Sequence, residues 1–177
     1  MLFWKNFFSR CNLIGDKPFS SRINFDQLLL KQVEYSDNKL NIYATSEPIF
    51  NLYELEQLCD SVGWVKRPQK RIKIALQNSF LTLTLFYFDS NHKQIIGFAR
   101  VTSDHTFHAT IWDVVVDPKF QGNGLGKLLL YYLIKQLRIA DISTVTLFAD
   151  SQVVNFYKKL GFIADPNNIK GMFWYPK

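Results

Sequence analysis

The stretch Val114–Lys127, VVVDPKFQGNGLGK, decides the fold of this chain. It begins as the end of an apolar strand, stops at Asp117-Pro118, and carries glycines at positions 122, 124 and 126 where a helix-forming run begins. Glycine allows positive φ and a close approach of the backbone to a ligand. The free N–H groups of a first helical turn, at the positive end of the helix dipole, attract anions. The stretch therefore predicts a strand–loop–helix unit that binds a phosphate or pyrophosphate.

Two common nucleotide motifs do not fit this loop. A P-loop needs Gly at 121 and Ser or Thr at 128, where the chain has Gln121 and Leu128. A dinucleotide fingerprint that starts at Gly122 needs Gly at 127, which is Lys127, and it opens near the first strand of a βαβ unit. A turn without a ligand does not need three alternating glycines, since each costs roughly 1 kcal/mol where it enters a helix.

Length and composition are those of one folded domain. The chain has 177 residues, 47% hydrophobic and 16% aromatic, which is enough for a full core. Its apolar run Phe80–Phe88 is far shorter than the roughly 20 residues of a membrane helix, so we expect a soluble protein without a membrane partner. Cys11 and Cys59 are too few for a disulfide framework or a zinc site. We therefore expect no metal, and we expect Cys59 to be a small core residue.

The net charge of +6 is concentrated in one segment that has no acidic residue between Asp60 and Asp89. Its basic residues are Lys66, Arg67, Lys70, Arg71 and Lys73. Such a cluster binds nucleic acid or another polyanion, or it forms a solvated helix face. No helix-turn-helix, zinc-finger or stacking-aromatic pattern accompanies the cluster, so the solvated face is favoured over nucleic-acid binding.

The N-terminal residues 1–38 are expected to form an arm outside the main domain. The first 15 residues contain two basic residues, no acid and several aromatics, as some targeting segments do, but they lack a typical cleavage site. Lys, Asn, Ile and Phe abound, whereas Gly and Ala are few. AT-rich genomes, organellar ones included, tend to encode such sequences.

Hydrophobic periodicity predicts the order of the elements. Strands are expected at Lys39–Thr45, Phe80–Phe88, Gln94–Thr102, Thr110–Val116 and Thr144–Ala149. Helices are expected from Pro48 to Gly63, from Pro68 to Asn78, from Gly124 to Ala140 and from Gln152 to Leu160. A short element at Phe25–Val33 and one or two closing strands within Phe162–Tyr175 complete the pattern. This order predicts an α+β layered fold.

The loop matches the Q/R-x-x-G-x-G/A motif of the GNAT superfamily of N-acetyltransferases, and Asn155–Phe162 (NFYKKLGF) resembles the second signature of that family. The resemblance covers residues 39–177, the expected acetyltransferase domain. The segments WDVVVDP, QGNGLGK, TLFAD and GMFWYP resemble the chloroplast and cyanobacterial branch, which includes plant chloroplast serotonin N-acetyltransferase. The resemblance implies a mixed, mostly antiparallel sheet, flanked by helices and splayed between its fourth and fifth strands.

The same resemblance implies acetyl-CoA as the donor and assigns residues to it. The backbone of Val114, Val115 and Val116 would pair with the pantetheine arm like an additional strand. The N–H groups of the loop would hold the pyrophosphate, and the loop consists of Gln121, Gly122, Asn123, Gly124, Leu125, Gly126 and Lys127. Asn155 matches a position that contacts the CoA arm, and its alternative role is to cap a helix.

The resemblance implies direct attack of an amine on the thioester. Tyr157 matches the general acid that protonates the CoA sulfur, and its alternative role is a core tyrosine. Asp113, a carboxylate inside an apolar strand, is the candidate base, or it makes a structural hydrogen bond. Many relatives carry a glutamate near the position of Thr110 instead. His105 and His108 are alternative bases, or exposed loop residues.

The sequence does not decide between two classes of acceptor: a small arylalkylamine such as serotonin, or a protein lysine or N-terminus. An acidic peptide would suit the basic cluster. A catalytically inactive CoA-binding regulatory module is the alternative function. The resemblance implies a plastid, or a cyanobacterial-type cytoplasm, as the location. The sequence leaves monomer and homodimer equally open.

Overall fold

The computed structural model describes residues 28–36, 38–47 and 51–175. Those up to residue 147 belong to one compact unit, and those from 148 onward belong to another. The first unit contains a six-stranded sheet whose strands follow one another in chain order. They are β1 (Leu28–Tyr35), β2 (Asn38–Thr45), β3 (Leu81–Asp89), β4 (His92–Ser103), β5 (His108–Val116) and β6 (Thr144–Leu147). All neighbours are antiparallel except β5 and β6, which run parallel. The predicted mixed, mostly antiparallel sheet is confirmed.

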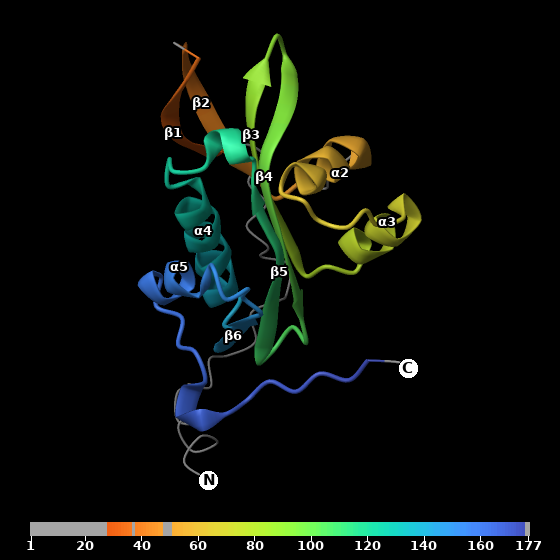
Figure 1. Ribbon diagram of the computed structural model, residues 1–177, viewed down its shortest axis with the longest axis vertical. Helices are drawn as coiled ribbons and strands as arrows, with labels where there is room; N and C mark the ends of the chain where they lie inside the picture. The colour runs from red at the N-terminus through yellow and green to blue at the C-terminus, as the bar shows by residue number, and fades with distance from the viewer. Residues whose placement is uncertain (1–27, 37, 48–50, 176–177) are drawn as a thin grey trace. The chain divides into compact units, whose positions relative to one another are not determined.

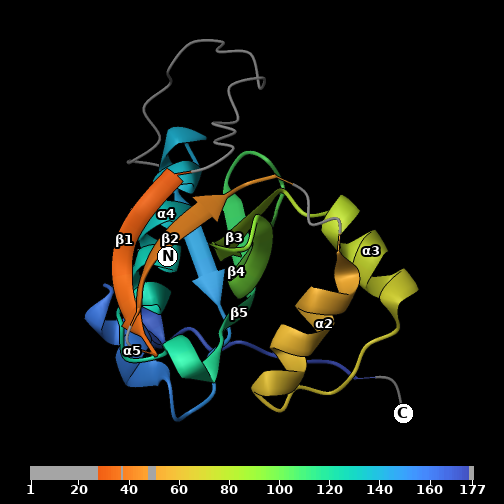
Figure 2. The ribbon, with the colours of Figure 1, turned by 90° about the horizontal axis from the view of Figure 1, so that it is seen from above.

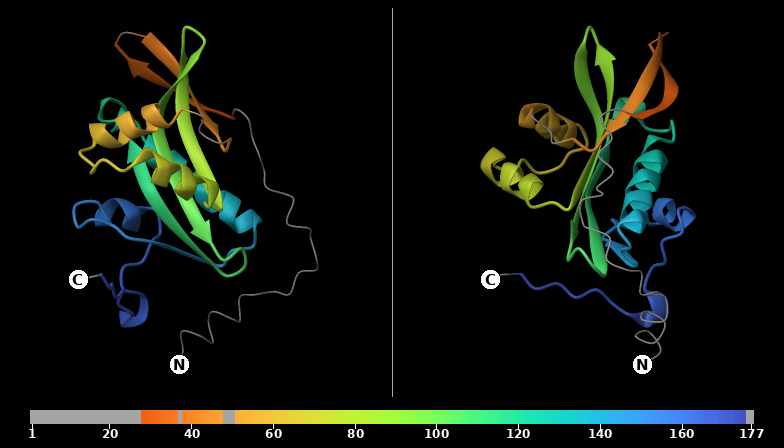
Figure 3. Two further views of the ribbon diagram at one scale, coloured as in Figure 1. Left: turned by 90° about the vertical axis from the view of Figure 1, so that its right-hand side faces the viewer. Right: turned by 180° about the vertical axis from the view of Figure 1, so that it is seen from behind.

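Helices cover both faces of this sheet. Helices α2 (Leu52–Ser61) and α3 (Gln69–Gln77) lie on one face, and α4 (Leu125–Ile139) lies on the other (Figures 1, 2 and 3). The core beneath α4 is formed by a stripe of leucines on this helix, in which Leu129, Leu130, Leu133 and Leu137 are each 0% exposed. The helices predicted for this unit are present, and their observed ends lie within a few residues of the predicted ends.

The helix on the opposite face starts at a side-chain cap. The Asn51 side chain accepts hydrogen bonds from the N–H groups of Tyr53 and Glu54 and thereby begins α2. One helical turn apart, Leu55 and Leu58 are buried together with Phe98 of β4 and Val115 of β5. This cluster fixes α2 over the two strands that carry the candidate site.

Strands β4 and β5 are out of register near the middle of β5. Phe98 faces Val115, but Arg100 faces Trp112, so β5 contains one residue more than β4 over this interval. The extra residue produces a β-bulge. Asp113 lies in it with φ of 54°, in the left-handed region that non-glycine residues seldom adopt. The bulge therefore places the candidate carboxylate at an irregular point of an otherwise regular strand.

Strands β5 and β6 are paired over only part of their length. The parallel ladder runs from His108 with Thr144 to Ile111 with Leu147, and β6 ends there. Residues 112–116 of β5 thus have no β6 partner among the described residues. The splay expected between the fourth and fifth strands falls here between β5 and β6, because β1 adds one strand before the first one that the sequence predicted.

Strand β1 is the main difference between the observed start of the fold and the start predicted from the sequence. It lies within the segment 1–38 that was expected to be an arm, and it pairs antiparallel with β2 from Leu28 to Tyr35. A register shift between Leu29 and Lys31 interrupts the two-residue alternation by which strands are recognised. For that reason the pattern indicated only a short element of undefined type.

The closing strands expected within Phe162–Tyr175 are absent from the described residues 162–175. The segment contains a single 3₁₀ turn, Pro166–Asn168, which no strand follows. Asp165, Asn167 and Asn168 have φ of 46°, 55° and 60°, values incompatible with an extended strand. The prediction of closing strands is therefore wrong for these residues, because turn-forming Asp and Asn residues interrupt the segment.

Among the described residues, no helix has both the length and the apolar character that crossing a membrane requires.

Candidate active site

The glycine loop joins the end of β5 to the start of α4. The Asp117 carboxylate accepts a hydrogen bond from the Lys119 N–H at 2.8 Å and begins the 3₁₀ turn Pro118–Phe120. The Phe120 side chain, 2% exposed, anchors this turn in the core. Gly122 and Gly124 follow with φ of 79° and 76°, and Gly124 caps α4. A Cβ at either glycine would meet no atom within 4 Å, so the left-handed backbone, not crowding, requires glycine there.

The first turn of α4 leaves its amide groups uncapped. The first i→i−4 hydrogen bond joins the Leu128 N–H to the Gly124 carbonyl at 3.1 Å. The amides of Leu125, Gly126 and Lys127 therefore precede the helical ladder, and no side chain caps the helix. Among the described residues these three N–H groups have no partner, and N–H groups in that position at the positive end of a 15-residue helix attract anionic groups such as phosphate.

Gln121 holds the loop in place through hydrogen bonds to neighbouring carbonyl groups. Its N–H donates to the Pro118 carbonyl at 3.3 Å, and its side-chain amide donates to the Val116 carbonyl at 2.9 Å. The first bond closes the 3₁₀ turn and the second fastens the loop to the end of β5, so the Gln121 N–H is already used. The Gln121 N–H is therefore not available to an anion. Fewer backbone N–H groups are available than the range Gln121–Lys127 that the resemblance implied.

A lysine that the sequence did not indicate reaches the same loop. The half-buried Lys31 of β1 donates from Nζ to the Asn123 carbonyl at 2.8 Å, while the Asn123 side chain donates to the Phe120 carbonyl at 3.2 Å. Lys31 thus holds the loop backbone and brings a positive charge beside the uncapped helix. It was missed because residues 1–38 were treated as an arm without any part in the site.

The edge of β5 next to this loop is open to an extended ligand. Val115 is 3% exposed and belongs to the buried cluster under α2, whereas Val114 and Val116 are half-buried. Because β6 ends at Leu147, the backbone of Val114–Val116 has no strand partner on that edge among the described residues. A strand edge without a partner offers N–H and C=O groups to an extended molecule.

The Asp113 carboxylate forms two ion pairs. Arg100 of β4 donates from Nε to Oδ2, and Arg67, between α2 and α3, donates from Nη1 to Oδ1 at 3.0 Å. The side chains of Arg100 and Asp113 are only 16% and 15% exposed, whereas that of Arg67 is 56% exposed. The inner pair therefore holds the carboxylate in place, and the outer one faces solvent.

Trp112, beside this carboxylate in sequence, is fixed by its own contacts. Its indole N–H donates to the Thr102 hydroxyl at 2.8 Å, and the Arg100 guanidinium lies 5.9 Å from its ring centroid. Arg100 thus contacts both an aromatic ring and a carboxylate, as guanidinium groups do at ordered sites.

In the second unit, Tyr157 and Asn155 lie on the short helix α5 (Val154–Lys159). The half-buried Tyr157 packs edge-on against Phe156 and Phe162, with centroid distances of 5.1 and 5.8 Å. Burial, together with the Asp150 carboxylate, raises the pKa of the Tyr157 phenol above its ordinary value. Asn155 is exposed, and the residue that caps α5 is Val153, so Asn155 does not have the capping role considered as its alternative.

The acetyltransferase (GNAT) family matches residues 49–162, nearly two thirds of the chain. The chain belongs to the GNAT family of acetyltransferases. It is 55% identical to the uncharacterized N-acetyltransferase ycf52 of Gracilaria tenuistipitata var. liui, over 99% of both chains. It is also 51% identical to GCN5-related N-acetyltransferase 2, chloroplastic, of Arabidopsis thaliana, over 72% of this chain and 55% of that one. The predicted N-acetyltransferase class, and the resemblance to the chloroplast branch, are confirmed.

A solved structure agrees with this GNAT assignment at the level of the fold. A GNAT-family acetyltransferase from Streptococcus pneumoniae superimposes with a TM-score of 0.64 at 22% identity, over 77% of this chain and 98% of that one. The predicted α+β fold with a splayed sheet is the GNAT fold.

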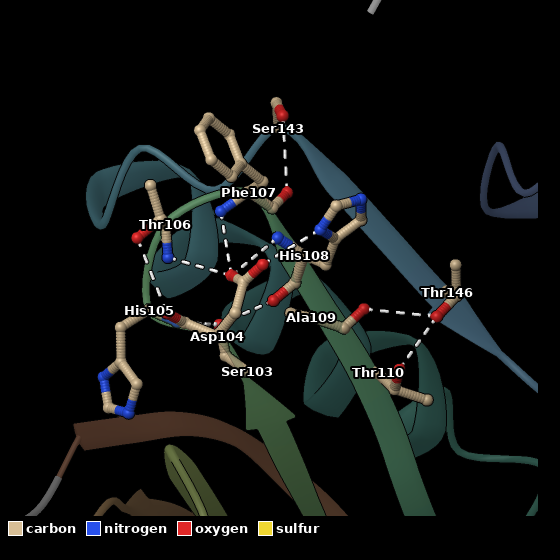
Figure 4. A network of polar contacts seen from close by, with 10 residues as sticks. All are labelled: Ser103, Asp104, His105, Thr106, Phe107, His108, Ala109, Thr110, Ser143 and Thr146. Atoms are coloured by element: carbon tan, nitrogen blue, oxygen red, sulfur yellow. Dashed lines mark hydrogen bonds and ion pairs between the residues drawn. The ribbon is translucent and has the colours of Figure 1, made fainter. Parts of the chain in front are cut away.

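The two histidines considered as bases lie at the other end of β5 in this GNAT fold (Figure 4). The Asp104 carboxylate accepts from the N–H groups of Thr106, Phe107 and His108 at 2.8–2.9 Å, and it pairs with His108 Nδ1 at 2.9 Å. These bonds hold the pKa of Asp104 far below its usual range. His108 precedes Asp113 by five strand positions, about 16 Å at the usual rise per residue. The structure therefore does not bring it to the bulge.

Cys59 of α2 lies near the bulge but is unsuited to covalent catalysis. Burial raises the pKa of its thiol to about 11, and the negative charge of Asp113 adds to that effect. A thiol that stays protonated at neutral pH is a poor nucleophile. Cys59 packs against the cluster that contains Leu55 and Val115, as the sequence predicted for a small core residue. Elsewhere in the described part of the chain, no three His, Cys, Asp or Glu side chains converge in a way that could hold a metal ion.

Proposed function

We propose that this GNAT chain transfers the acetyl group of acetyl-CoA to a primary amine by direct attack. The observation that carries the proposal is the continuity of two features. They are the uncapped amides of Leu125, Gly126 and Lys127, and the edge of β5 at Val114–Val116, which lies beyond the end of β6. The amides suit the pyrophosphate, and the edge suits the amide-containing pantetheine arm. Lys31 and the backbone of Gly122, Asn123 and Gly124 support the same end of the donor.

In this proposal the neutral amine nitrogen attacks the thioester carbonyl carbon, and a C–N bond forms as the C–S bond breaks. Tyr157 supplies the proton that the departing CoA sulfur takes up, and Asn155 contacts the arm of the donor. A phenol is protonated at neutral pH, as this role requires, and the raised pKa of Tyr157 extends its protonation to higher pH. The proton lost by the amine passes to the bulge carboxylate, Asp113. Its Oδ2 is occupied by Arg100, whereas Oδ1 is shared with the exposed Arg67 and is the oxygen that can be released.

The acceptor is a small arylalkylamine such as serotonin, or a lysine or N-terminus of a protein. We place the enzyme in a plastid or a cyanobacterial-type cytoplasm. The chloroplastic relative and the composition typical of AT-rich genomes support that location.

CoA release from acetyl-CoA, measured against a panel of aryl amines, lysine peptides and N-terminal peptides, tests the function. Turnover on at least one amine is expected, and Tyr157→Phe and Asp113→Asn should lower it. Calorimetric binding of acetyl-CoA without turnover on any amine would contradict the proposal and would favour a regulatory module.

A further inference from the structure

The outward face of α3 is a dense basic surface. Lys70, Arg71 and Lys73 are exposed, whereas Ile72 and Leu76 point toward the protein and are half-buried. No Asp or Glu occurs between Asp60 and Asp89, so α3 contributes no negative charge, and the only acid of the strand that follows is its last residue, Asp89. We call Lys70, Arg71 and Lys73 the α3 basic face.

Lys66 and Arg67, which precede α3, form ion pairs, whereas the residues of the α3 basic face form none among the described residues. Lys66 pairs with Glu56 at 3.0 Å, and Arg67 pairs with Asp113. Within the described parts of the chain, no ion pair neutralises any of the three residues of the face. Three unneutralised cations on nine residues of helix create a positive potential that attracts anions.

The start of α3 is held beside the β5 bulge. Glu56, which is 6% exposed, binds Lys66 through one carboxylate oxygen and accepts a hydrogen bond from the Gln69 side chain at 3.2 Å through the other. Arg67 touches the Asp113 carboxylate directly. Lys70 and Lys73 lie one and four positions after Gln69, about 1.5 and 6 Å along the helix axis from it. The α3 basic face therefore follows directly on the segment that contacts the Asp113 carboxylate.

We propose that the α3 basic face selects polypeptide acceptors that carry Asp or Glu close to the amine that becomes acetylated. This inference rests on the proposed function and names its acceptor class. An extended peptide advances about 3.3 Å per residue, so acids one to four residues from the amine would reach Lys70 and Lys73. Nucleic acid is the less suitable occupant, because α3 presents no aromatic residue on which a base could stack.

The test compares peptides with one free lysine amine that differ only in their flanks: two Glu, two Gln or two Lys within four residues of that amine. For the wild-type chain, kcat/KM should be about 5–10-fold higher for the Glu peptide than for the Gln peptide, as expected for two or three exposed charge pairs. The Lys peptide should be the poorest of the three. Raising the salt from 0.05 to 0.5 M should remove most of the difference.

The double variant Lys70→Gln, Lys73→Gln should abolish the preference for Glu flanks and leave turnover of the Gln peptide unchanged. Lys135→Gln with Arg138→Gln is the matched control, because it removes the same charge from an exposed part of α4 on the opposite face of the sheet. Equal kcat/KM for the three peptides, or an equal loss of preference in both double variants, would overturn the inference. The inference would also fail if Lys70→Gln, Lys73→Gln weakened binding of single-stranded RNA while leaving the peptide preference intact.

Failure of the proposed function has a separate signature. If no peptide is acetylated, fluorescence anisotropy of the labelled Glu and Gln peptides still measures binding to the face. Tighter binding of the Glu peptide, lost in Lys70→Gln, Lys73→Gln, would support the docking surface without transfer. Turnover on all peptides without a preference would keep the enzyme and reject the surface.

Discussion

Arg100 and Asp113 form an ion pair across the β4–β5 bulge, and both side chains are largely shielded from water. The pair joins a residue of β4 to the irregular residue of β5, and Arg67 reaches the same carboxylate from the segment between α2 and α3. Three elements thus converge on a single side chain, and the conformation of the bulge depends on it.

Removal of the inner guanidinium should destabilise the fold. In Arg100→Met, the carboxylate keeps only an exposed partner, and we expect a loss of about 1–3 kcal/mol in the free energy of unfolding, measured by urea denaturation. Arg67→Met is the control, with an expected loss of about 0–1 kcal/mol, because its pair is open to solvent. Equal losses in the two variants would show that burial does not distinguish the two pairs.

Substitution of Gly124 should separate backbone strain from steric blocking. Gly124→Ala places a Cβ where no atom lies within 4 Å, so the expected loss of about 1 kcal/mol arises from the left-handed φ. Gly124→Asn should lose less, because Asn tolerates this region better. Thermal unfolding measures both effects, and calorimetry with acetyl-CoA shows whether the amides of the next turn still bind. An equal loss for Ala and Asn would contradict the conformational explanation.

Tyr157→Phe should lower kcat by roughly 100-fold or more, with the affinity for acetyl-CoA nearly unchanged, if the phenol is the acid. The phenol donates only while protonated. Because its pKa is raised, kcat should persist to higher pH than for an ordinary tyrosine, whose pKa is about 10.

The alkaline limb of that pH profile offers a further check. Asp150→Asn removes one of the two causes of the raised pKa, so the limb should move to lower pH. A profile that does not change in Asp150→Asn, together with normal turnover of Tyr157→Phe, would exclude Tyr157 as the acid.

Gly97→Ala should be one of the most damaging small substitutions in the sheet. The new Cβ would lie 3.0 Å from Leu85 Cδ1 and 3.2 Å from Leu85 Cβ, and Leu85 is fully buried. Overpacking of this kind costs about 1–3 kcal/mol, which chemical denaturation would detect. In the double variant with Leu85→Val, the combined loss should be smaller than the sum of the single losses. Strict additivity would contradict the predicted clash.

Asp104 should make the β4–β5 turn sensitive to acid. Its pKa is lowered by hydrogen bonds from backbone N–H groups and His108, so its contribution to stability is complete above the ordinary pKa near 4 and is lost as pH falls further. Asp104→Ala should therefore lower the melting temperature more at pH 7 than at pH 2, where part of this contribution is already lost. The same decrease at both pH values would mean that the carboxylate charge is not involved.

The sequence predicted the elements that periodicity and glycine spacing control. The strands between Lys39 and Leu147, the helix after Gly124 and the loop itself were located correctly because each has a strong local signal. The bulge was not predicted, because the arginines that hold Asp113 come from 46 and 13 residues earlier in the chain. No local pattern reports a contact between such distant residues.

Two regions were misread for physical reasons. Strand β1 contains a register shift next to Lys31, which conceals its alternation and concealed its contact with the loop. The segment that contains Asp165 and Asn167 was expected to form closing strands, although left-handed residues interrupt any strand there. The sequence therefore located the glycine loop and the end of β5, but not the side-chain contacts that reach them from distant strands.

The bond from Lys31 Nζ to the Asn123 carbonyl spans 92 positions of sequence. Its consequence concerns proteolysis. A nick just after Lys31 would cut the covalent link between that lysine and β2, so that noncovalent contacts, those of residues 28–31 with β2 among them, would have to retain it. Loss of the severed N-terminal piece would remove this bond from the loop, although every residue of the loop itself remained on the larger fragment.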